Sequence, residues 1–392
     1  MRILTLATLF PNAARPNFGI FVERQTAALA DREGVEIVVI SPQAVPPWPL
    51  SRHPRYRAIA ALARQESWRG LDVHRPRFPH MPGIGAHLQP QLMVRAIWPL
   101  IERLHRERPF DLIDAEFFYP DGPAARVIAQ RLGIPYSVKA RGADIHHWGH
   151  DSRTREAVKM AGQDAAGLLA VSAAMKQDMI ALGMSDEKIT VHYTGCDQQR
   201  FVPQDGTALR AELGIAGPMI ITVGALIARK RQHLAIEALA ALPGATLVLA
   251  GAGEEERAHR QLAARLGLAG RVIMAGALPH DDLPRWLAAA DVMVLPSRSE
   301  GLANAWVESL ACGTPIVICD AGGAGELLTD PVAGRIAEPE PAALAQALAE
   351  MIALKPDPWL VRKVVSHFTW QRNADELHRH FARLLGSQRT LP

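Results

Sequence analysis

The chain has 392 residues, which is more than one hydrophobic core usually holds, so its length predicts two domains. Hydrophobic residues make up 48% and charged residues 21% of the sequence, as in soluble globular proteins, and no apolar run reaches the roughly 20 residues that cross a bilayer. The three cysteines cannot all pair and lack metal-ligand spacing, which favours a reducing, cytoplasmic location.

The first apolar stretch, residues 3–10, is broken by Pro11 before any convincing cleavage site, so a buried strand explains it better than a signal peptide does. Further apolar runs alternate with helical stretches to the end of the chain. This alternation predicts an α/β fold with parallel sheets. The expected strands are 2–7, 35–40, 71–75, 111–115, 135–140, 167–172 and 189–193 in the first half, and 219–224, 245–250, 271–276, 291–296 and 315–319 in the second.

Two segments interrupt this pattern. Residues 41–60 hold five prolines and are predicted to form a long irregular loop. Residues 195–206 contain Gly, Asp and Pro without a strong period, and we place the interdomain linker there, between domains at 1–198 and 199–372. Two doubly wound domains that face each other would hold a ligand in the crevice at the carboxyl ends of their strands.

The positive charge is concentrated in one segment. Between residues 49 and 108 there are eleven Arg and no Lys against four acidic residues, a net charge of +7, and tryptophans are interleaved with them. One interpretation is a solvated face, and the other is attraction to anionic lipid headgroups or to a phosphate-bearing acceptor. Nucleic acid is not an expected partner, because no recognition motif accompanies the charge.

The segment with the most chemistry is 295–319. The pattern predicts a strand that ends at Pro296, a turn with Ser and Gly, and a helix at 303–311. Such a turn presents free backbone N–H groups and the positive end of a helix, which suit phosphate or sugar oxygens. Glu300 and Glu308 would lie up to roughly 12 Å apart at 1.5 Å per residue. That span suits one carboxylate on the sugar and one on the ribose of a nucleotide sugar, although two ordinary surface glutamates would also satisfy the pattern.

This segment resembles the family-4 retaining glycosyltransferases of the GT-B fold, and the resemblance covers nearly the whole chain. The motif residues are Pro296-Ser297, Glu300-Gly301, Glu308, 311–317 and 322–326. The resemblance implies two Rossmann-like domains, with Glu300 on the donor-sugar hydroxyls and Glu308 on the ribose hydroxyls. It also implies that donor sugar and phosphates bind the backbone amides of Gly301, Leu302, Ala303 and Asn304.

Residues 223–230 resemble the family's Gly-Arg-Leu-x-x-x-Lys loop, which places Lys230 on the diphosphate as a catalytic cation. The sequence departs from the family at Ala225, where a second cation is common, and Arg229 is the candidate substitute. Gly253 resembles a further nucleotide-facing turn. Gly19 resembles the glycine loop that faces the donor phosphates, where the absence of a side chain permits close approach.

Residues 114–122 and 141–144 resemble a subset of the family with Tyr-Pro-Asp-Gly and Arg-Gly-x-Asp motifs. Arg141 stands where the larger set carries His, and it is predicted to be a catalytic cation beside the diphosphate. Tyr119, His146 and Asp144 are the acceptor-side candidates, and a structural helix cap is the alternative for Asp144. The histidines near position 146 lack ligand spacing, so no metal site is expected.

The resemblance implies retaining transfer of a hexose-type sugar from a UDP- or GDP-linked donor to a lipid-linked or surface-polysaccharide acceptor, without metal or other cofactor. Domain 1–198 would be the acceptor side, domain 199–372 the nucleotide-sugar side, and 373–392 a helix that returns to the first domain. The protein would act in the cytoplasm, in peripheral contact with the inner face of the plasma membrane through 49–108. Alternatives are a sugar-nucleotide epimerase of the same fold and an inactive nucleotide-sugar-binding scaffold. A dinucleotide oxidoreductase is disfavoured because both Gly-x-Gly turns lack the third glycine.

Overall fold

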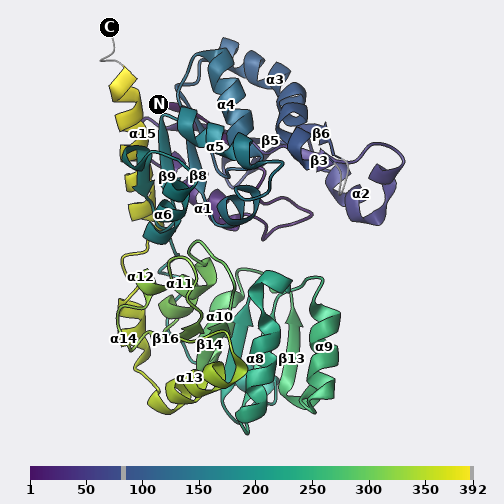
Figure 1. Ribbon diagram of the computed structural model, residues 1–392, viewed down its shortest axis with the longest axis vertical. Coiled ribbons are helices and arrows are strands. Elements are labelled where there is room, and N and C mark those ends of the chain that lie inside the picture. Colours follow the sequence, from purple (N-terminus) through teal and green to yellow (C-terminus); the bar gives the residue numbers. More distant parts are fainter. Residues whose placement is uncertain (81–84, 389–392) are drawn as a thin grey trace. The chain divides into compact units, whose positions relative to one another are not determined.

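The computed structural model describes residues 1–80 and 85–388 (Figure 1). The chain divides into two compact units: unit 1 holds Met1–Gly195 and Trp370–Pro392, and unit 2 holds Cys196–Thr369. Residues 81–84, in the predicted basic segment, and 389–392, at the end of the predicted C-terminal helix, lie outside the described residues. No helix in the described part of the chain is both long and apolar enough to cross a membrane.

Unit 1 is built on an eight-stranded sheet of order β10-β9-β8-β7-β1-β2-β5-β4. All neighbouring strands are parallel except β4 and β5. The strands are β1 (Arg2–Leu6), β2 (Glu36–Ile40), β4 (Gln65–Trp68), β5 (Leu71–His74), β7 (Leu112–Ala115), β8 (Tyr136–Ala140), β9 (Gly167–Ala170) and β10 (Ile189–Val191). The strand order reverses between β1 and β7, which is the point where doubly wound sheets open a ligand crevice.

Helices cover this sheet. The helix α15 (Trp370–Gln388) packs on α1 (Ile20–Ala30), and Phe381 and Leu29 from these helices share a hydrophobic core with Ile3 and Val39 of the sheet. A second group, in which α4 packs against both α3 and α5, is visible in Figure 1. This second group consists of α3 (Gln89–Glu107), α4 (Asp121–Leu132) and α5 (Arg155–Asp164). The other α-helices of unit 1 are α2 (Pro54–Ala60) and α6 (Ala173–Ala181).

Unit 2 is built on a six-stranded, wholly parallel sheet of order β13-β12-β11-β14-β15-β16, which reverses between β11 and β14. The strands are β11 (Met219–Val223), β12 (Thr246–Ala250), β13 (Val272–Gly276), β14 (Val292–Leu295), β15 (Ile316–Ile318) and β16 (Gly334–Ile336). The helices are α7 (Thr207–Glu212), α8 (Gln232–Ala238), α9 (Glu256–Arg265), α10 (Leu283–Ala289), α11 (Asn304–Ala311), α12 (Ala324–Leu327), α13 (Pro341–Leu354) and α14 (Pro358–Lys363). The predicted α/β class with two doubly wound sheets is therefore confirmed.

The prediction for 41–60 was wrong. This segment contains β3 (Gln43–Val45), which pairs with β6 (Arg77–Pro79), and the helix α2. Pro54 is compatible with α2 because it is the first helical residue, where a missing N–H costs no hydrogen bond. The other prolines of the segment lie outside β3 and α2, so proline content alone overstated the irregularity.

Candidate active site

The predicted Glu300-Gly301 turn joins β14 to α11 at the carboxyl edge of the unit 2 sheet. Gly322 has a φ of 55° and approaches this turn so closely that a Cβ on it would lie 2.2 Å from the Glu300 carbonyl oxygen. The N–H of Gly323 donates to the Gly301 carbonyl at 2.8 Å. Only glycine fits at position 322, and Gly322 and Gly323 together hold the shape of the Glu300-Gly301 turn.

The amides at the start of α11 follow directly. Leu302 and Ala303 are buried, Ala303 is the cap residue, and Asn304 is the first helical residue. The Ala303 side chain makes no capping hydrogen bond, so the helix begins with backbone N–H groups that no cap side chain satisfies. The positive end of α11 is thus arranged to accept oxygen atoms of a ligand.

The Glu300 carboxylate is bound by two cations. Its side chain is 8% exposed, Lys230 Nζ donates to Oε1, and Arg229 Nη1 lies 3.2 Å from Oε2. Burial by itself would raise the pKa of Glu300, but the charges of Lys230 and Arg229 outweigh it and hold that pKa below its ordinary value. Burial lowers the pKa of Lys230, and the charge of Glu300 opposes this effect. Arg229 therefore brings a second positive charge to a loop in which Ala225 carries none.

Glycines position the loop that carries these cations. A Cβ on Gly251 would lie 1.9 Å from the Gly224 carbonyl oxygen, and one on Gly253 would lie 2.2 Å from the Leu226 carbonyl oxygen. The Leu226 N–H in turn donates to the Ala252 carbonyl at 3.0 Å. Gly253, which was predicted to face the nucleotide, is thus required in the first place by backbone packing against the Lys230 loop.

Glu308, the second predicted carboxylate, is paired with a histidine that the sequence interpretation missed. His280 Nε2 lies 2.8 Å from Glu308 Oε1, and the two side chains are 13% and 14% exposed. The His280 ring packs against the Phe201 ring at 5.3 Å between centroids. His280 follows closely after β13. Its place at the carboxyl edge of the sheet is the feature by which the sequence could have marked it as a candidate site residue.

In unit 1, two predicted donor-side residues occupy different environments. Gly19 has a φ of 74°, and a Cβ there would lie 2.5 Å from Leu9 backbone atoms, so the glycine is required by backbone contact. Arg141 is only 8% exposed, and its guanidinium pairs with the fully buried Glu116 carboxylate and donates to the Glu116 carbonyl. It also lies 4.8 Å above the Phe21 ring. The charge of Arg141 is thus already balanced by a carboxylate of the same unit.

The acceptor-side candidates differ in their burial and hydrogen bonds. Asp144 is fully buried and accepts hydrogen bonds from the N–H groups of Phe118, Arg141 and Gly142. Asp144 is not a helix cap, because the cap residue of the short helix Asp144–Trp148 is Ala143 and makes no side-chain hydrogen bond. Its carboxylate instead holds the backbone that precedes this helix, and its acceptor-side role stays a prediction. Tyr119 is also buried, against the Trp148 ring at 5.0 Å, and burial raises the pKa of its hydroxyl. Tyr119 therefore packs in the interior of unit 1, and its acceptor-side role stays a prediction.

His146, the third acceptor-side candidate, is partly exposed, and its Nε2 lies 2.8 Å from Asp178 Oδ2. This contact joins the short helix Asp144–Trp148, which follows β8, to α6. In the described residues, no group of three or more His, Cys, Asp or Glu side chains is placed to hold a metal ion.

Each unit matches one glycosyltransferase family model. Residues 207–359 match the model of glycosyl transferases group 1, and residues 19–195 match that of the glycosyl transferase 4-like domain. The chain is a glycosyltransferase of the GT-B fold. The glycosyl transferase 4-like domain lies in unit 1 and the group 1 domain lies in unit 2, which agrees with the two predicted Rossmann-like domains.

TuaC and the two solved structures named below match nearly the whole glycosyltransferase, and a further relative matches about half of it. It is 29% identical to TuaC of Bacillus subtilis (strain 168), a protein assigned as a teichuronic acid biosynthesis glycosyltransferase, over 97% of this chain and 98% of that one. It is 33% identical to the D-inositol 3-phosphate glycosyltransferase of Mycolicibacterium gilvum (strain PYR-GCK), over 54% of this chain and 51% of that one. Anabaena HepE in complex with UDP-glucose has a TM-score of 0.76 at 23% identity, over 98% and 100% of the two chains. Sucrose-phosphate synthase from Thermosynechococcus elongatus has a TM-score of 0.80 at 18% identity, over 98% and 99%. These structural likenesses show the fold.

A buried polar cluster in unit 1 of the glycosyltransferase was also missed by the sequence interpretation. Lys139 is fully buried in β8, where its Nζ donates to Gln25 Oε1 and lies 2.8 Å from His192 Nδ1. Gln25 in turn donates to Glu116. Burial, followed by the charge of Arg141, lowers the pKa of Lys139 from 10.5 to about 7. The residues around Lys139 in the sequence are typical of a buried strand and indicate no partner for its charge. For this reason the sequence did not single out Lys139 as a functional candidate.

Lys139 predicts a pH effect on stability. The unfolded chain keeps the lysine proton to pH ~10.4, whereas the folded chain releases it near pH 7. Between these values the unfolded state binds more protons, so this residue makes the free energy of unfolding rise with pH. In Lys139→Met the rise from pH 7 to 9, measured by urea unfolding, should be smaller than in the wild type. An identical pH dependence in both proteins would show that Lys139 is not the titrating group.

Proposed function

We propose that this glycosyltransferase is a retaining enzyme that transfers a hexose-type sugar from a UDP- or GDP-linked donor to a lipid-linked or surface-polysaccharide acceptor, without a metal ion. The observation that carries the proposal is the Glu300 carboxylate bound by Lys230 and Arg229 beside the uncapped start of α11. The name of TuaC supports a polysaccharide acceptor, and the bound UDP-glucose of HepE supports a nucleotide-sugar donor.

The proposed chemistry follows from the charges in unit 2. The bond between the sugar and the diphosphate breaks, and negative charge develops on the departing phosphate oxygen. Lys230, Arg229 and the amides of α11 are positive groups that would stabilise that charge, which is the task a divalent cation performs in other enzymes. Glu300 would bind the donor-sugar hydroxyls. The acceptor oxygen would form the new bond to the anomeric carbon on the face that the phosphate leaves, and the departing phosphate would take the acceptor proton. Because the new bond forms on that same face, the anomeric configuration would be retained.

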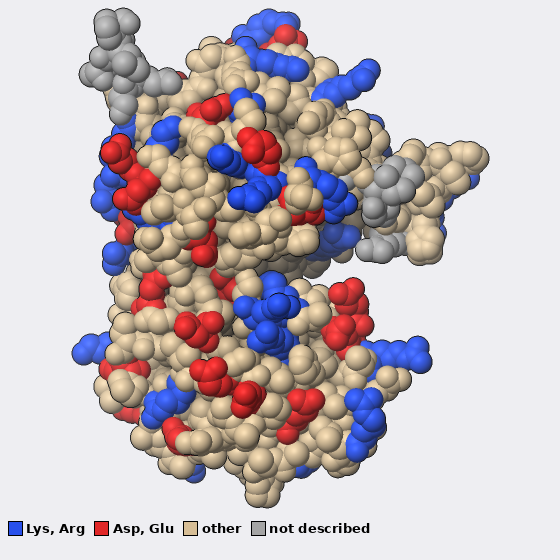
Figure 2. Space-filling view, in the orientation of Figure 1, with Lys and Arg blue, Asp and Glu red and all other residues tan. Residues whose placement is uncertain are grey.

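A second part of the proposal concerns location. We place the enzyme in the cytoplasm, in peripheral contact with the inner face of the plasma membrane through the basic segment 49–108. Several arginines of this segment pair with carboxylates, for example Arg75 with Glu66 and Arg103 with Glu107. On the face shown in Figure 2, acidic side chains are interspersed with the basic ones of unit 1. The contact would therefore depend on local groups rather than on one uniformly basic surface.

A panel of UDP- and GDP-sugars tests the function, with release of the nucleoside diphosphate measured with and without lipid extract and with EDTA. We expect release that needs an acceptor and survives EDTA, and a product whose anomeric configuration matches the donor. Consumption of donor without acceptor, with formation of an epimer, would support the epimerase instead. A complete lack of turnover would support the inactive scaffold, and strict metal dependence would contradict the metal-free mechanism.

Glu308 predicts a change in donor binding. Loss of a hydrogen bond to a charged group costs about 1.5–3 kcal/mol, so Glu308→Gln should raise the donor KM roughly ten- to a hundred-fold. The kcat should change much less, because the ribose is remote from the bond that breaks. Steady-state kinetics with varied donor measure both. Glu350→Gln, which removes an exposed partner of Arg335 in the same unit, is the matched control. A main effect on kcat would contradict the ribose assignment.

A further inference from the structure

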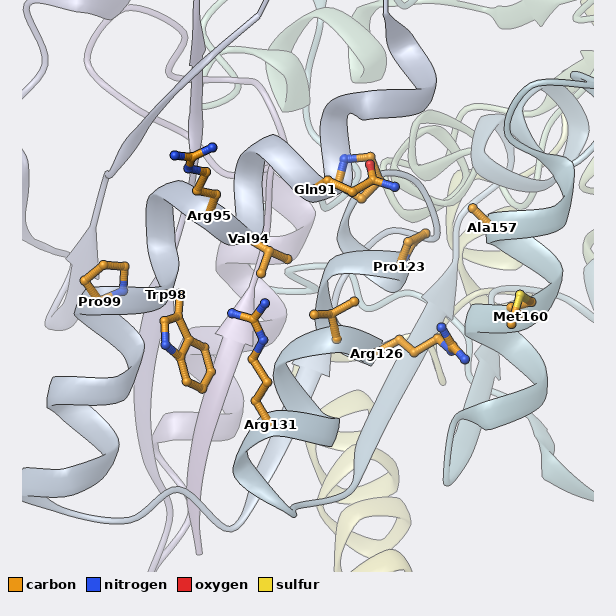
Figure 3. A pocket seen from close by; sticks show the side chains of 12 residues that line it. Gln91, Val94, Arg95, Trp98, Pro99, Pro123, Arg126, Arg131, Ala157 and Met160 are labelled. Atoms are coloured by element: carbon orange, nitrogen blue, oxygen red, sulfur yellow. The ribbon is translucent and has the colours of Figure 1, made fainter.

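A cluster of charged side chains converges in the interior of unit 1, whereas those of the surface groove among α3, α4 and α5 do not converge. In that groove Arg95 points away from Arg131, so the two arginines do not form one anion site (Figure 3). Lys139 lies in β8 and Arg141 directly follows that strand, and Glu116 directly follows the neighbouring strand β7. Because residues two apart in a strand point to the same face of a sheet, Lys139 and Arg141 share one face. The register of β7 and β8 places Glu116 beside them.

Hydrogen bonds and an ion pair connect the members of this cluster. One oxygen of the Glu116 carboxylate pairs with Arg141, and the other accepts a hydrogen bond from Gln25 Nε2. Gln25 Oε1 in turn accepts from Lys139 Nζ at 2.5 Å. Glu116, Gln25 and Lys139 are buried, and the Arg141 side chain is 8% exposed. One carboxylate is thus connected to two cations, and of these four residues Arg141 is the one that reaches the surface.

His192 also contacts Lys139, and its ring is neutral. His192 Nε2 lies 2.8 Å from the backbone carbonyl oxygen of Asn373 on α15. A carbonyl oxygen only accepts, so Nε2 carries the ring proton and Nδ1 presents a lone pair to Lys139 Nζ at 2.8 Å. Burial, followed by the charge of Lys139, lowers the pKa of His192 and keeps the ring neutral. His192 therefore accepts a hydrogen bond from Lys139 and supplies no counter-charge.

Three further titratable side chains interact electrostatically with Lys139: Asp114 of β7, and Glu376 and His380 of α15. Burial, followed by the charge of Glu116, raises the pKa of Asp114, so this carboxyl favours its protonated form. Burial lowers the pKa of His380 to about 4, which leaves that ring neutral at pH 7. Glu376 is partly exposed and already pairs with an arginine of α15. The acidic neighbours on these elements are therefore a carboxyl that favours its proton and a carboxylate that water screens.

The charge of Lys139 consequently lacks a carboxylate of its own. Because Glu116 is already paired with Arg141, the cluster with Asp114 protonated is neutral without the lysine proton and carries one positive charge with it. A buried charge without its own partner is disfavoured, and burial lowers the pKa of Lys139 to about 7. An anion that pairs with Arg141 brings negative charge next to the cluster, which favours the protonated lysine.

We propose that Lys139 takes up a proton from solution when the donor diphosphate pairs with Arg141, so that donor binding is coupled to protonation of this lysine. The proton bonds to the lone pair of Lys139 Nζ, and the resulting ammonium group acts on Glu116 through Gln25. Glu116 then stays balanced while Arg141 shares its hydrogen bonds with the diphosphate. Lys139 is a positioning residue, since it acts through other side chains. The inference deepens the proposed function and rests on it, because it takes Arg141 as a contact of the donor.

Titration calorimetry of the full chain with UDP, and separately with GDP, measures this coupling. The binding heat is compared in HEPES and Tris buffers at pH ~8, where the terminal phosphate of the nucleotide is already ionised because its pKa is about 6. The difference in heat between the two buffers, which differ in ionisation enthalpy, gives the number of protons that the protein takes up. We expect roughly 0.5–1 proton per bound nucleotide in the wild type, which makes the Kd rise roughly three- to ten-fold from pH 7.5 to 8.5.

Lys139→Met removes the group that takes up the proton, so the uptake should fall by roughly 0.5 proton or more. Lys139→Gln tests the same point if methionine unfolds the chain, because glutamine keeps an N–H donor for Gln25 and His192 and carries no charge. The matched control is Lys176→Met, which removes a lysine of α6 that is paired with Asp186 in the same unit. Its proton uptake should equal that of the wild type.

Equal proton uptake in the wild type and in both Lys139 variants would overturn the inference and would point to Lys230 of unit 2, whose pKa burial also lowers. Binding of a nucleotide without proton uptake would overturn it as well. A sugar-transfer assay separates the inference from the proposed function. Transfer without proton-coupled binding refutes the coupling alone, whereas proton-coupled binding without transfer counts against the proposed function alone. Failure of both nucleotides to bind would refute both.

Discussion

Glu300→Gln should lower kcat roughly 10²- to 10³-fold, the loss that follows removal of one well-placed charged or hydrogen-bonding group from an active site. The glutamate is buried and bound by both Lys230 and Arg229. Glutamine keeps the shape of the side chain but leaves these two cations without their carboxylate. The change therefore disturbs both the sugar contact and the positions of the cations.

Steady-state kinetics and thermal unfolding of Glu300→Gln separate these effects. The variant should have a donor KM close to that of the wild type, in contrast to Glu308→Gln. Removal of one partner from a buried ion pair also costs about 3–5 kcal/mol of stability, so the assay temperature has to lie well below the unfolding transition of the variant. Equal and mild changes of kcat and KM in the glutamine variants of both glutamates would refute the assignments.

Lys230→Met should lower kcat by a similar factor, roughly 10²- to 10³-fold. Methionine retains the unbranched length of lysine and removes the charge that would stabilise the departing diphosphate. Burial lowers the pKa of Lys230 but Glu300 opposes this, so the charge depends on that carboxylate. The drop should be smaller with donors whose leaving group is a weaker base, because such a group needs less stabilisation. A drop that is the same for all leaving groups would contradict the role.

Arg229 provides the internal comparison for Lys230. Arg229→Ala removes the second cation at Glu300, and Ala225→Arg in that background returns a cation to the position where the resembling family carries one. Partial recovery of kcat in the double variant is the expected result. No recovery, together with a loss in Arg229→Ala, would show that Arg229 acts from its own position only.

The parallel sheets could be predicted because their strands are continuous apolar runs. The strands β3, β4, β6 and β16 escaped prediction because they are short and their exposure alternates or is high, so hydrophobicity gives no clear period. The segment around α2 was misjudged for a related reason: its prolines indicate where helices and strands stop, but not whether short elements fit between them.

The sequence by itself determined the Glu300–Glu308 turn and helix, since a strand end, a glycine, a helix of eight residues and a helix stop all lie within one continuous segment. Only the tertiary structure decided which charges meet. Lys230 and Glu300 are 70 residues apart, Arg141 and Glu116 are 25 apart, and His280 and Glu308 are 28 apart. These pairs meet because parallel strands bring their carboxyl ends to one edge of a sheet, and strand order is set by packing rather than by local pattern. The two arginines also differ in the charge around them. Arg229 and Lys230 share the single carboxylate of Glu300, whereas the charge of Arg141 is balanced by the buried carboxylate of Glu116.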